Sequence, residues 1–282
     1  MLKRKIIILV LLSVLGACSK KDVPDTVKQF IDDGEKHPLV IILNGSSGGN
    51  LFASPQYRSI LTQFNEHGLS VASIGYFGTK NTPSRPVKLS LDDIYDRIMV
   101  LAEDEKINRQ CIALFGFSKG AELALLLGSH FDNIKQTVAI YPSHVSWNAL
   151  RSPTSQPAWL LDGKPLDYID APLLSWNMLS GLFTKNYVEA FDSALSKAST
   201  AQIDNSRIPV ENLQGPLFLV SAKSDEIWPS NRMALEIVEY LNEKGFSYSV
   251  EHIELEGGHF SYDRATEQKI LMHLQNTMAD GC

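Results

Sequence analysis

Short apolar runs alternate with amphipathic segments along most of this 282-residue chain. Most of the runs are continuously apolar rather than apolar at every second position, which is the pattern of a strand buried on both faces. The segments between them repeat apolar residues at helical spacing. Such alternation predicts an α/β protein with a mostly parallel, doubly wound sheet. The strands are expected at residues 39–44, 69–76, 111–115, 137–141, 216–221 and 247–255.

The alternation breaks down between residues 144 and 208. This stretch contains three of the four tryptophans, several prolines and no clear strand. A long insertion of this kind in a compact domain is typical of a functional lid. We therefore expect a cap-like insertion at about 145–208, over the carboxyl edge of the sheet, that shapes the substrate site. The alternative is a surface excursion that packs independently.

A short motif stands at the end of the third expected strand. Residues 116–120 read Gly-Phe-Ser-Lys-Gly and are followed by a helical segment at 121–127. A strand, this turn and a helix together present a serine on a strained turn, and the flanking glycines remove side chains that would collide with the neighbouring strand and helix. The motif predicts Ser118 as a nucleophile and, with the alternation, an α/β-hydrolase fold.

Two further residues occur where this fold places the partners of the nucleophile. Asp225 follows the strand expected at 216–221, and His259 follows the strand expected at 247–255. The order serine, acid, histidine is that of α/β hydrolases. We expect His259 to take the Ser118 proton and Asp225 to fix the imidazole tautomer. Glu226 is the alternative acid. Asp225 could instead be a turn residue, and His259 a surface-loop residue, neither with a catalytic role.

The loop at residues 44–49 reads Asn-Gly-Ser-Ser-Gly-Gly and follows the first expected strand. In this fold the oxyanion hole uses one backbone N–H from such a loop and one from the residue after the nucleophile. We therefore expect the N–H groups of Lys119 and Ser46, in preference to Ser47, to stabilise the oxyanion. Phosphate binding is the alternative for this loop, which lacks both the Gly-Lys-Ser/Thr ending and the dinucleotide fingerprint.

The sequence gives no indication of a site for a metal, a cofactor or a nucleic acid. Histidine, cysteine and carboxylate residues do not cluster at metal-ligand spacing, and the formal net charge of -6 leaves no basic footprint for nucleic acid. We expect catalysis without a metal or cofactor.

Residues 116–125 closely resemble the nucleophile turn of the acyl-CoA thioesterase and bile acid-CoA:amino acid N-acyltransferase family, whose signature is Gly-x-Ser/Cys-Lys-Gly-x-Glu. Residues 208–216 and 225–230 are similar to the acid region of that family. The resemblance implies a serine hydrolase of the acyl-CoA thioester hydrolase type, which cleaves a small acyl ester or thioester through an acyl-enzyme on Ser118. Transferase members typically carry cysteine at this position, so the resemblance implies hydrolysis more than transfer.

Two other functions remain open at this level. A peptidase or amidase could use the same fold, because a catalytic triad does not by itself set the leaving group. The protein could also be a binding lipoprotein, anchored through the amino-terminal segment described next, that kept the fold and lost catalysis. The presence of Ser118, Asp225 and His259 together argues against this alternative.

The amino terminus has the form of a secretory signal. Lys3, Arg4 and Lys5 precede an apolar stretch at residues 6–15, which is too short to span a bilayer. Residues 15–18 read Leu-Gly-Ala-Cys and resemble the lipobox of bacterial lipoproteins. An ordinary cleaved signal and a short membrane anchor are the alternatives.

The lipobox resemblance implies cleavage before Cys18, lipids on that cysteine, and a membrane-anchored protein on the periplasmic or extracytoplasmic face. Ser19 stands in place of the aspartate that typically retains lipoproteins in the inner membrane, which favours the outer membrane. The predicted division is a signal peptide at 1–17, the lipidated cysteine and a tether at 18–37, and the hydrolase domain at 38–282. Because acyl-CoA is a cytoplasmic metabolite, this location points to another ester, thioester or amide unless the lipobox is misread.

Overall fold

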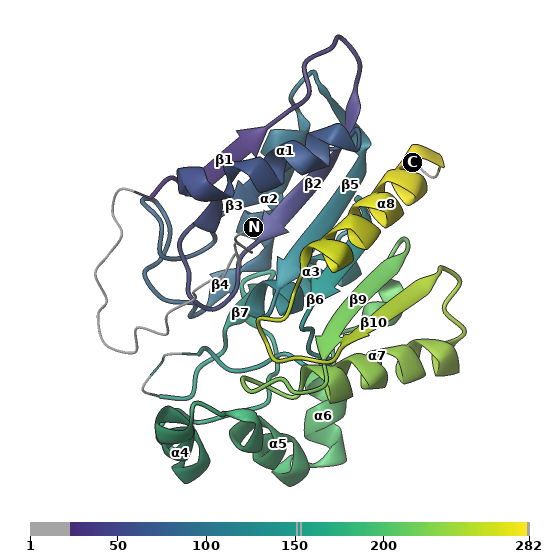
Figure 1. The fold of residues 1–282 in the computed structure, drawn as a ribbon. Coiled ribbons are helices and arrows are strands. Elements are labelled where there is room, and N and C mark those ends of the chain that lie inside the picture. Colours follow the sequence, from purple (N-terminus) through teal and green to yellow (C-terminus); the bar gives the residue numbers. More distant parts are fainter. Residues whose placement is uncertain (1–22, 151, 153, 281–282) are drawn as a thin grey trace, which may run out of the picture.

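The computed structural model describes residues 23–150, 152 and 154–280, so the predicted signal peptide and Cys18 lie outside the described residues. A seven-stranded sheet runs through the molecule in the order β1-β3-β2-β5-β6-β9-β10 (Figure 1). All neighbouring pairs are parallel except β1 and β3. This confirms the predicted α/β fold with a mostly parallel sheet. The strands are β1 (Thr26–Gln29), β2 (His37–Leu43), β3 (Ser70–Ile74), β5 (Ile107–Phe117), β6 (Ile134–Ile140), β9 (Leu217–Ala222) and β10 (Val250–Leu255).

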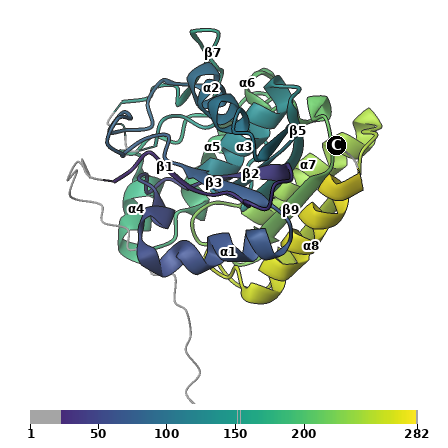
Figure 2. The same cartoon turned by 90° about the horizontal axis from the view of Figure 1, so that it is seen from above.

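Helices cover both faces of the sheet (Figure 2). Side chains of α2 (Leu91–Ala102), α3 (Lys119–His130) and α7 (Ser230–Lys244) share one apolar core with one side of the strands. Side chains of α1 (Arg58–Glu66) and α8 (Arg264–Asp280) share a second core with the other side. Because each central strand is buried between two helical layers, its sequence is continuously apolar rather than alternating.

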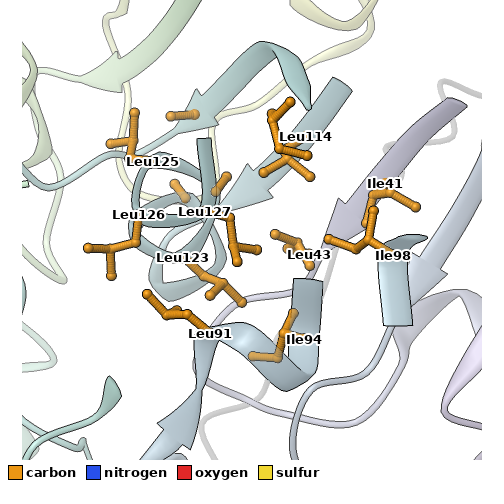
Figure 3. Close-up of a cluster of buried hydrophobic side chains, with 14 of the residues drawn as sticks. Ile41, Leu43, Leu91, Ile94, Ile98, Leu114, Leu123, Leu125, Leu126 and Leu127 are labelled. Carbon is orange, nitrogen blue, oxygen red and sulfur yellow. The ribbon is translucent and has the colours of Figure 1, made fainter. Parts of the chain in front are cut away.

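The core between α2, α3 and the sheet takes up one apolar side of α2. Ile94 and Ile98 of α2 lie close to Ile41 and Leu43 of β2 (Figure 3). The side chain of Ser90 accepts a hydrogen bond from the third residue of α2 and so caps this helix. The buried apolar side and the cap at Ser90 together account for the position of this helix.

The strand β1 corrects the prediction that residues 18–37 form only a tether. Thr26–Gln29 pairs antiparallel with β3, with Thr26 opposite Ile74. Only Val27 of this strand belongs to an apolar cluster, as a partly buried residue packed against it. An edge strand needs few apolar residues because one side of it faces solvent, and it therefore reads as a polar segment in the sequence.

The insertion between β6 and β9 has its own short elements. They are β7 (Trp159–Leu161), β8 (Lys164–Pro165), α4 (Trp176–Thr184), α5 (Val188–Lys197) and α6 (Thr200–Ser206), followed by the 3-10 turn η3 (Val210–Asn212). β7 pairs with β8 and with β4 (Leu89–Ser90), so the expectation of no strand here is wrong. Each pairing spans only two residues, too few to produce a recognisable run. Across the residues that the structure describes, no helix is both long enough and apolar enough to cross a bilayer.

Candidate active site

Ser118 lies on the turn between β5 and α3, in the middle of the sheet. Its backbone has φ 53° and ψ -118°, a region that residues other than glycine rarely adopt. A side chain on Gly116 would collide with the backbone of Gly120, and one on Gly120 would collide with the backbone of Leu43. The two glycines are therefore required for the helix and the neighbouring strand to approach the serine this closely.

Asp225 and His259 form a buried pair at the carboxyl ends of β9 and β10. The His259 Nδ1 atom lies 2.9 Å from Oδ1 and 2.8 Å from Oδ2 of Asp225. The two residues are only 8% and 4% exposed, so water does not compete for this hydrogen bond. The structure therefore brings together the acid and the histidine that the sequence predicts.

Neighbouring groups hold the carboxylate of Asp225 in place. Its Oδ1 atom accepts hydrogen bonds from the backbone N–H of Ile227 at 2.9 Å and of Trp228 at 3.2 Å. Its Oδ2 atom accepts one from the Ser230 hydroxyl at 2.5 Å. The block that follows the acid thus wraps around the carboxylate, which leaves the plane of Asp225 fixed with respect to the imidazole.

Glu226, the alternative acid, has a different role. Its Oε2 atom accepts the backbone N–H of His259 at 2.9 Å rather than a bond from the ring. A side chain on Gly258 would collide with this carboxylate. Glu226 therefore fixes the backbone of the histidine loop while Asp225 contacts the imidazole.

Aromatic rings enclose the imidazole of His259. Tyr141 stacks on it with ring centroids 4.5 Å apart, and Trp228 meets it edge-on at 6.4 Å. The Tyr141 hydroxyl accepts the backbone N–H of Tyr262 at 2.8 Å, which ties the end of β6 to the segment after His259. Burial raises the pKa of Tyr141, so the phenol stays neutral beside the histidine.

Ser118 and His259 line the same cavity, which has a volume of about 280 Å³. No hydrogen bond joins their side chains, both of which the structure describes. Such contacts are often loose in the absence of substrate and tighten in the reacting complex. Most of the remaining cavity wall is apolar or aromatic: Ile42, Leu51, Phe52, Tyr57, Ile60, Phe64, Phe115, Phe117, Tyr141, Ile227, Phe260 and Tyr262.

The outer wall of this cavity comes from residues 51–64, which form the 3-10 turns η1 (Leu51–Ala53) and η2 (Pro55–Tyr57) and the start of α1. No described residue of the insertion at 145–208 lines it. The prediction that this insertion shapes the substrate site is therefore wrong for this cavity. The reason is topological: the cavity extends into the core shared by α1 and α8, whereas the insertion contributes Ala149, Ala158 and Trp159 to the core on the opposite face.

Lys119 and Ser46, whose backbone N–H groups the sequence predicts for the oxyanion hole, both lie near Ser118. Lys119 is the first residue of α3, where a helical N–H has no carbonyl of its own helix to bond. Ser46 lies in the cavity wall, and its N–H has no acceptor among the described residues. Gly45 brings this loop close to Ser118, because a side chain there would lie 3.5 Å from the Ser118 Cβ. The loop is held by the Tyr76 hydroxyl, which donates to the Asn44 carbonyl at 2.6 Å.

A buried ion pair directly after Ser118 was not recognised from the sequence. The Lys119 Nζ atom lies 2.7 and 2.8 Å from the two carboxylate oxygens of Glu122, and both side chains are fully buried. Oε1 of Glu122 also accepts hydrogen bonds from the Trp147 N–H at 3.1 Å and from the indole of Trp159 at 2.7 Å. Opposite charges three residues apart on a helix are the signal that could have indicated it. The pair joins the first turn of α3 to the insertion, and burial lowers the pKa of Lys119.

His144 lies beyond the end of β6 and does not line the cavity. Its Nδ1 atom has no hydrogen-bond partner among the described residues. Burial, with a smaller effect from the charges of Arg207 and Arg232, lowers the pKa of His144 to about 3. Within the described part of the chain, no group of three or more His, Cys, Asp and Glu side chains could hold a metal ion.

A serine on a strained turn after a central parallel strand, with an acid and a histidine after two later strands, defines the class: the protein is an α/β hydrolase. Solved structures of this fold agree. An acylaminoacyl peptidase of Pyrococcus horikoshii aligns with a TM-score of 0.57 at 16% identity, over 90% of this chain and 38% of its own. A putative dienelactone hydrolase of Klebsiella pneumoniae aligns with a TM-score of 0.52 at 14% identity, over 90% of this chain and 98% of its own.

Sequence comparison gives the family. The model of the BAAT / Acyl-CoA thioester hydrolase C terminal family matches residues 95–262, and the chain belongs to this family. Human acyl-coenzyme A thioesterase 6 is 28% identical over 210 residues, which are 74% of this chain and 45% of that protein. Mouse acyl-coenzyme A amino acid N-acyltransferase 1 is 25% identical over 211 residues, again 74% of this chain and 45% of that protein. The chain thus spans about half the length of the curated relatives it matches.

Proposed function

We propose that this protein is a serine hydrolase of the acyl-CoA thioesterase type, which cleaves an acyl thioester or ester through an acyl-enzyme on Ser118. The observation that carries the proposal is the convergence of three groups: Ser118 on its strained turn, the buried Asp225–His259 pair, and an apolar cavity lined by both Ser118 and His259. The relatives that are named as acyl-coenzyme A thioesterases support the thioester as substrate.

The reaction begins with proton transfer from the Ser118 hydroxyl to Nε2 of His259, while Oγ attacks the acyl carbonyl. The N–H groups of Lys119 and Ser46 donate to the oxyanion of the tetrahedral intermediate. His259 then returns the proton to the leaving thiolate or alkoxide as the C–S or C–O bond breaks. Asp225 accepts a hydrogen bond from the Nδ1–H of the imidazole throughout, so Nε2 stays available as the base, and the carboxylate charge stabilises the imidazolium.

Water completes the cycle by the same steps in the second half of the reaction. It loses a proton to His259 and attacks the acyl-Ser118 ester, and the proton returns to the serine as the carboxylic acid leaves. Transferase members of the family typically carry cysteine at this position. The serine of this chain therefore supports hydrolysis over transfer.

The wall of the cavity supports an acyl chain as the group that enters it. Phe52, Ile60 and Phe64 offer apolar surface and no charge. Each methylene moved from water into such surroundings contributes about 0.8 kcal/mol, which is about a fourfold gain in kcat/KM if it is realised in the transition state. The leaving group, whether coenzyme A or an alcohol, then stays outside this apolar wall.

An activity-based probe tests the nucleophile. A fluorophosphonate is expected to label the folded protein at Ser118, with no labelling of Ser118→Ala and unchanged labelling of Ser155→Ala, an exposed serine of the insertion. Labelling of Ser118→Ala equal to that of the wild type would contradict the proposal. A panel of acyl-CoA, p-nitrophenyl ester and peptide substrates, compared by kcat/KM, then identifies the leaving group. Preference for peptides would favour the peptidase alternative.

We further propose that Cys18 carries the lipid anchor of a bacterial lipoprotein and that the hydrolase domain lies on the extracytoplasmic side of the membrane. The positive residues 3–5, the apolar stretch and the Leu-Gly-Ala-Cys run support this proposal. Metabolic labelling with palmitate is expected in the wild type and absent in Cys18→Ala. Equal labelling of the two proteins would refute the anchor.

A further inference from the structure

Large apolar side chains gather on the surface of the insertion, around helix α4. Trp176 and Phe183, at the two ends of this short helix, are 84% and 89% exposed. Leu173, Leu174 and Leu182 are exposed beside them. Among the described residues, five of the eleven exposed large hydrophobic side chains lie within this single stretch of the chain. Scattered exposed apolar residues are ordinary on a protein surface, but a concentration of this kind is typical of a surface that binds a protein, a membrane or a ligand.

The chemistry of this surface matches the interface of a lipid bilayer. Helix α4 reads Trp-Asn-Met-Leu-Ser-Gly-Leu-Phe-Thr and has no charged residue, and Lys185 follows it directly. Trp176 and Phe183 are seven positions apart, which places both on one side of the helix. An aromatic and leucine-rich helix side with a basic residue at its end is the pattern of helices that lie in the headgroup region of a membrane.

The path of the chain brings this surface to the side where the amino-terminal segment enters the domain. Because β1 is antiparallel to β3, its first residue lies opposite Ile74, the last residue of that strand. The carbonyl of Val23 accepts a hydrogen bond from the Lys80 N–H at 3.1 Å, beyond the carboxyl end of β3. The insertion that carries α4 also extends from the carboxyl ends of the strands (Figure 1).

The distance along the chain is short. Cys18 precedes Val23 by five residues, which span at most about 18 Å even when fully extended. A lipid on Cys18 would therefore hold the carboxyl edge of the sheet, and with it α4, close to the bilayer. We infer, on the basis of the anchor proposed at Cys18, that Leu173, Leu174 and helix α4 form a membrane-docking surface that inserts its apolar side chains into the lipid interface.

The tryptophans allow a direct test. Trp147, Trp159 and Trp228 are at most 1% exposed, so Trp176 is the one tryptophan of the four in this chain that faces solvent. The full protein is reconstituted with vesicles of phosphatidylcholine and phosphatidylglycerol, with and without bromine on the acyl chains. We expect a blue shift of the emission and quenching by the brominated lipid, both of which disappear in Trp176→Phe.

A double variant and a control variant distinguish docking of this surface from attachment through the lipid on Cys18 alone. Leu174→Ser with Phe183→Ser is expected to shift the ratio of docked to undocked molecules by about tenfold or more toward the undocked state, while the anchor still holds the protein on the vesicle. Val100→Ser removes an exposed apolar side chain from α2 and is expected to leave the quenching unchanged. The same quenching is expected in Ser118→Ala, because docking does not depend on the proposed hydrolysis.

Three results would overturn the proposal. They are no quenching in the wild type, quenching that Leu174→Ser with Phe183→Ser does not reduce, and a blue shift that rises with protein concentration in the absence of vesicles. The last result would assign the surface to a second copy of the chain instead.

Discussion

Breaking the buried pair of Lys119 and Glu122 one residue at a time is expected to destabilise the fold strongly. Glu122→Gln leaves the Lys119 ammonium without a countercharge in a fully buried position. Lys119→Met leaves the carboxylate with only the two N–H donors of Trp147 and Trp159. Removing one partner of a buried ion pair costs about 3–5 kcal/mol. For a domain of this size that is a fall in Tm of roughly 6–20 °C.

The double variant Lys119→Met with Glu122→Gln should recover much of that loss. Glutamine keeps a carbonyl oxygen that can accept from Trp147 and Trp159, and methionine fills the space of the lysine stem without a charge. Neutral replacements of a buried pair are often close to the wild type in stability. The free energy of unfolding of all four proteins is measured in urea, which gives the coupling energy of the pair directly.

Additive losses would contradict this prediction. If the loss in free energy of unfolding in the double variant equals the sum of the two single losses within about 0.5 kcal/mol, Lys119 and Glu122 act independently and not as a pair. The exposed pair Lys223–Glu256 serves as the matched control, because its N–O distance is also 2.7 Å while its side chains are 46% and 84% exposed. Breaking that pair with Glu256→Gln should leave the unfolding midpoint unchanged.

Three further outcomes are expected. Asp225→Asn should lower kcat/KM by about 10⁴-fold, because the amide no longer holds the productive imidazole tautomer; steady-state kinetics on a thioester would measure it, and a loss below tenfold would contradict the assignment. Ser118→Gly should raise the free energy of unfolding by about 1 kcal/mol while abolishing hydrolysis, because glycine adopts the φ of 53° without strain. Urea denaturation tests this, and a less stable variant would disprove it. Ile60→Trp should shorten the preferred acyl chain, with about a fourfold loss in kcat/KM for each excluded methylene. Kinetics on a series of acyl chain lengths would show an unchanged preference if the cavity does not hold the acyl group.

Much of the fold was predictable because its strands are buried on both faces. The runs at 111–115 and 216–221 could be recognised for that reason, and Ser118 and Asp225 could be selected because each follows such a run. His259 follows β10, an edge strand with no buried residue, and was selected by its place in the order serine, acid, histidine. The strand at Thr26–Gln29 was not predicted, because an edge strand needs little apolar surface. The sequence therefore predicts the interior strands and the edge strand β10, but not the edge strand β1.

The shape of the cavity could not be predicted in the same way. Its outer wall comes from Phe52, Ile60 and Phe64, which read as ordinary core residues in sequence and reach Ser118 only through tertiary packing. The insertion was expected to form this wall because it is long and aromatic. In the fold its aromatic residues Trp147 and Trp159 serve the core and the hydrogen bonds of Glu122 instead. Local pattern identified the catalytic candidates, and only the three-dimensional arrangement identified what surrounds them.

The position of the cavity on the α1 side of the sheet has an evolutionary consequence. Residues 51–64, which wall the cavity, and residues 145–208, which form the insertion, belong to separate stretches of the chain, and no described residue of the insertion lines the cavity. A lineage could therefore alter, shorten or replace the outer helices of the insertion without changing which acyl group fits beside Ser118. Under the proposed docking and hydrolysis, selection on the location of the protein and selection on its substrate would act on different segments of one gene.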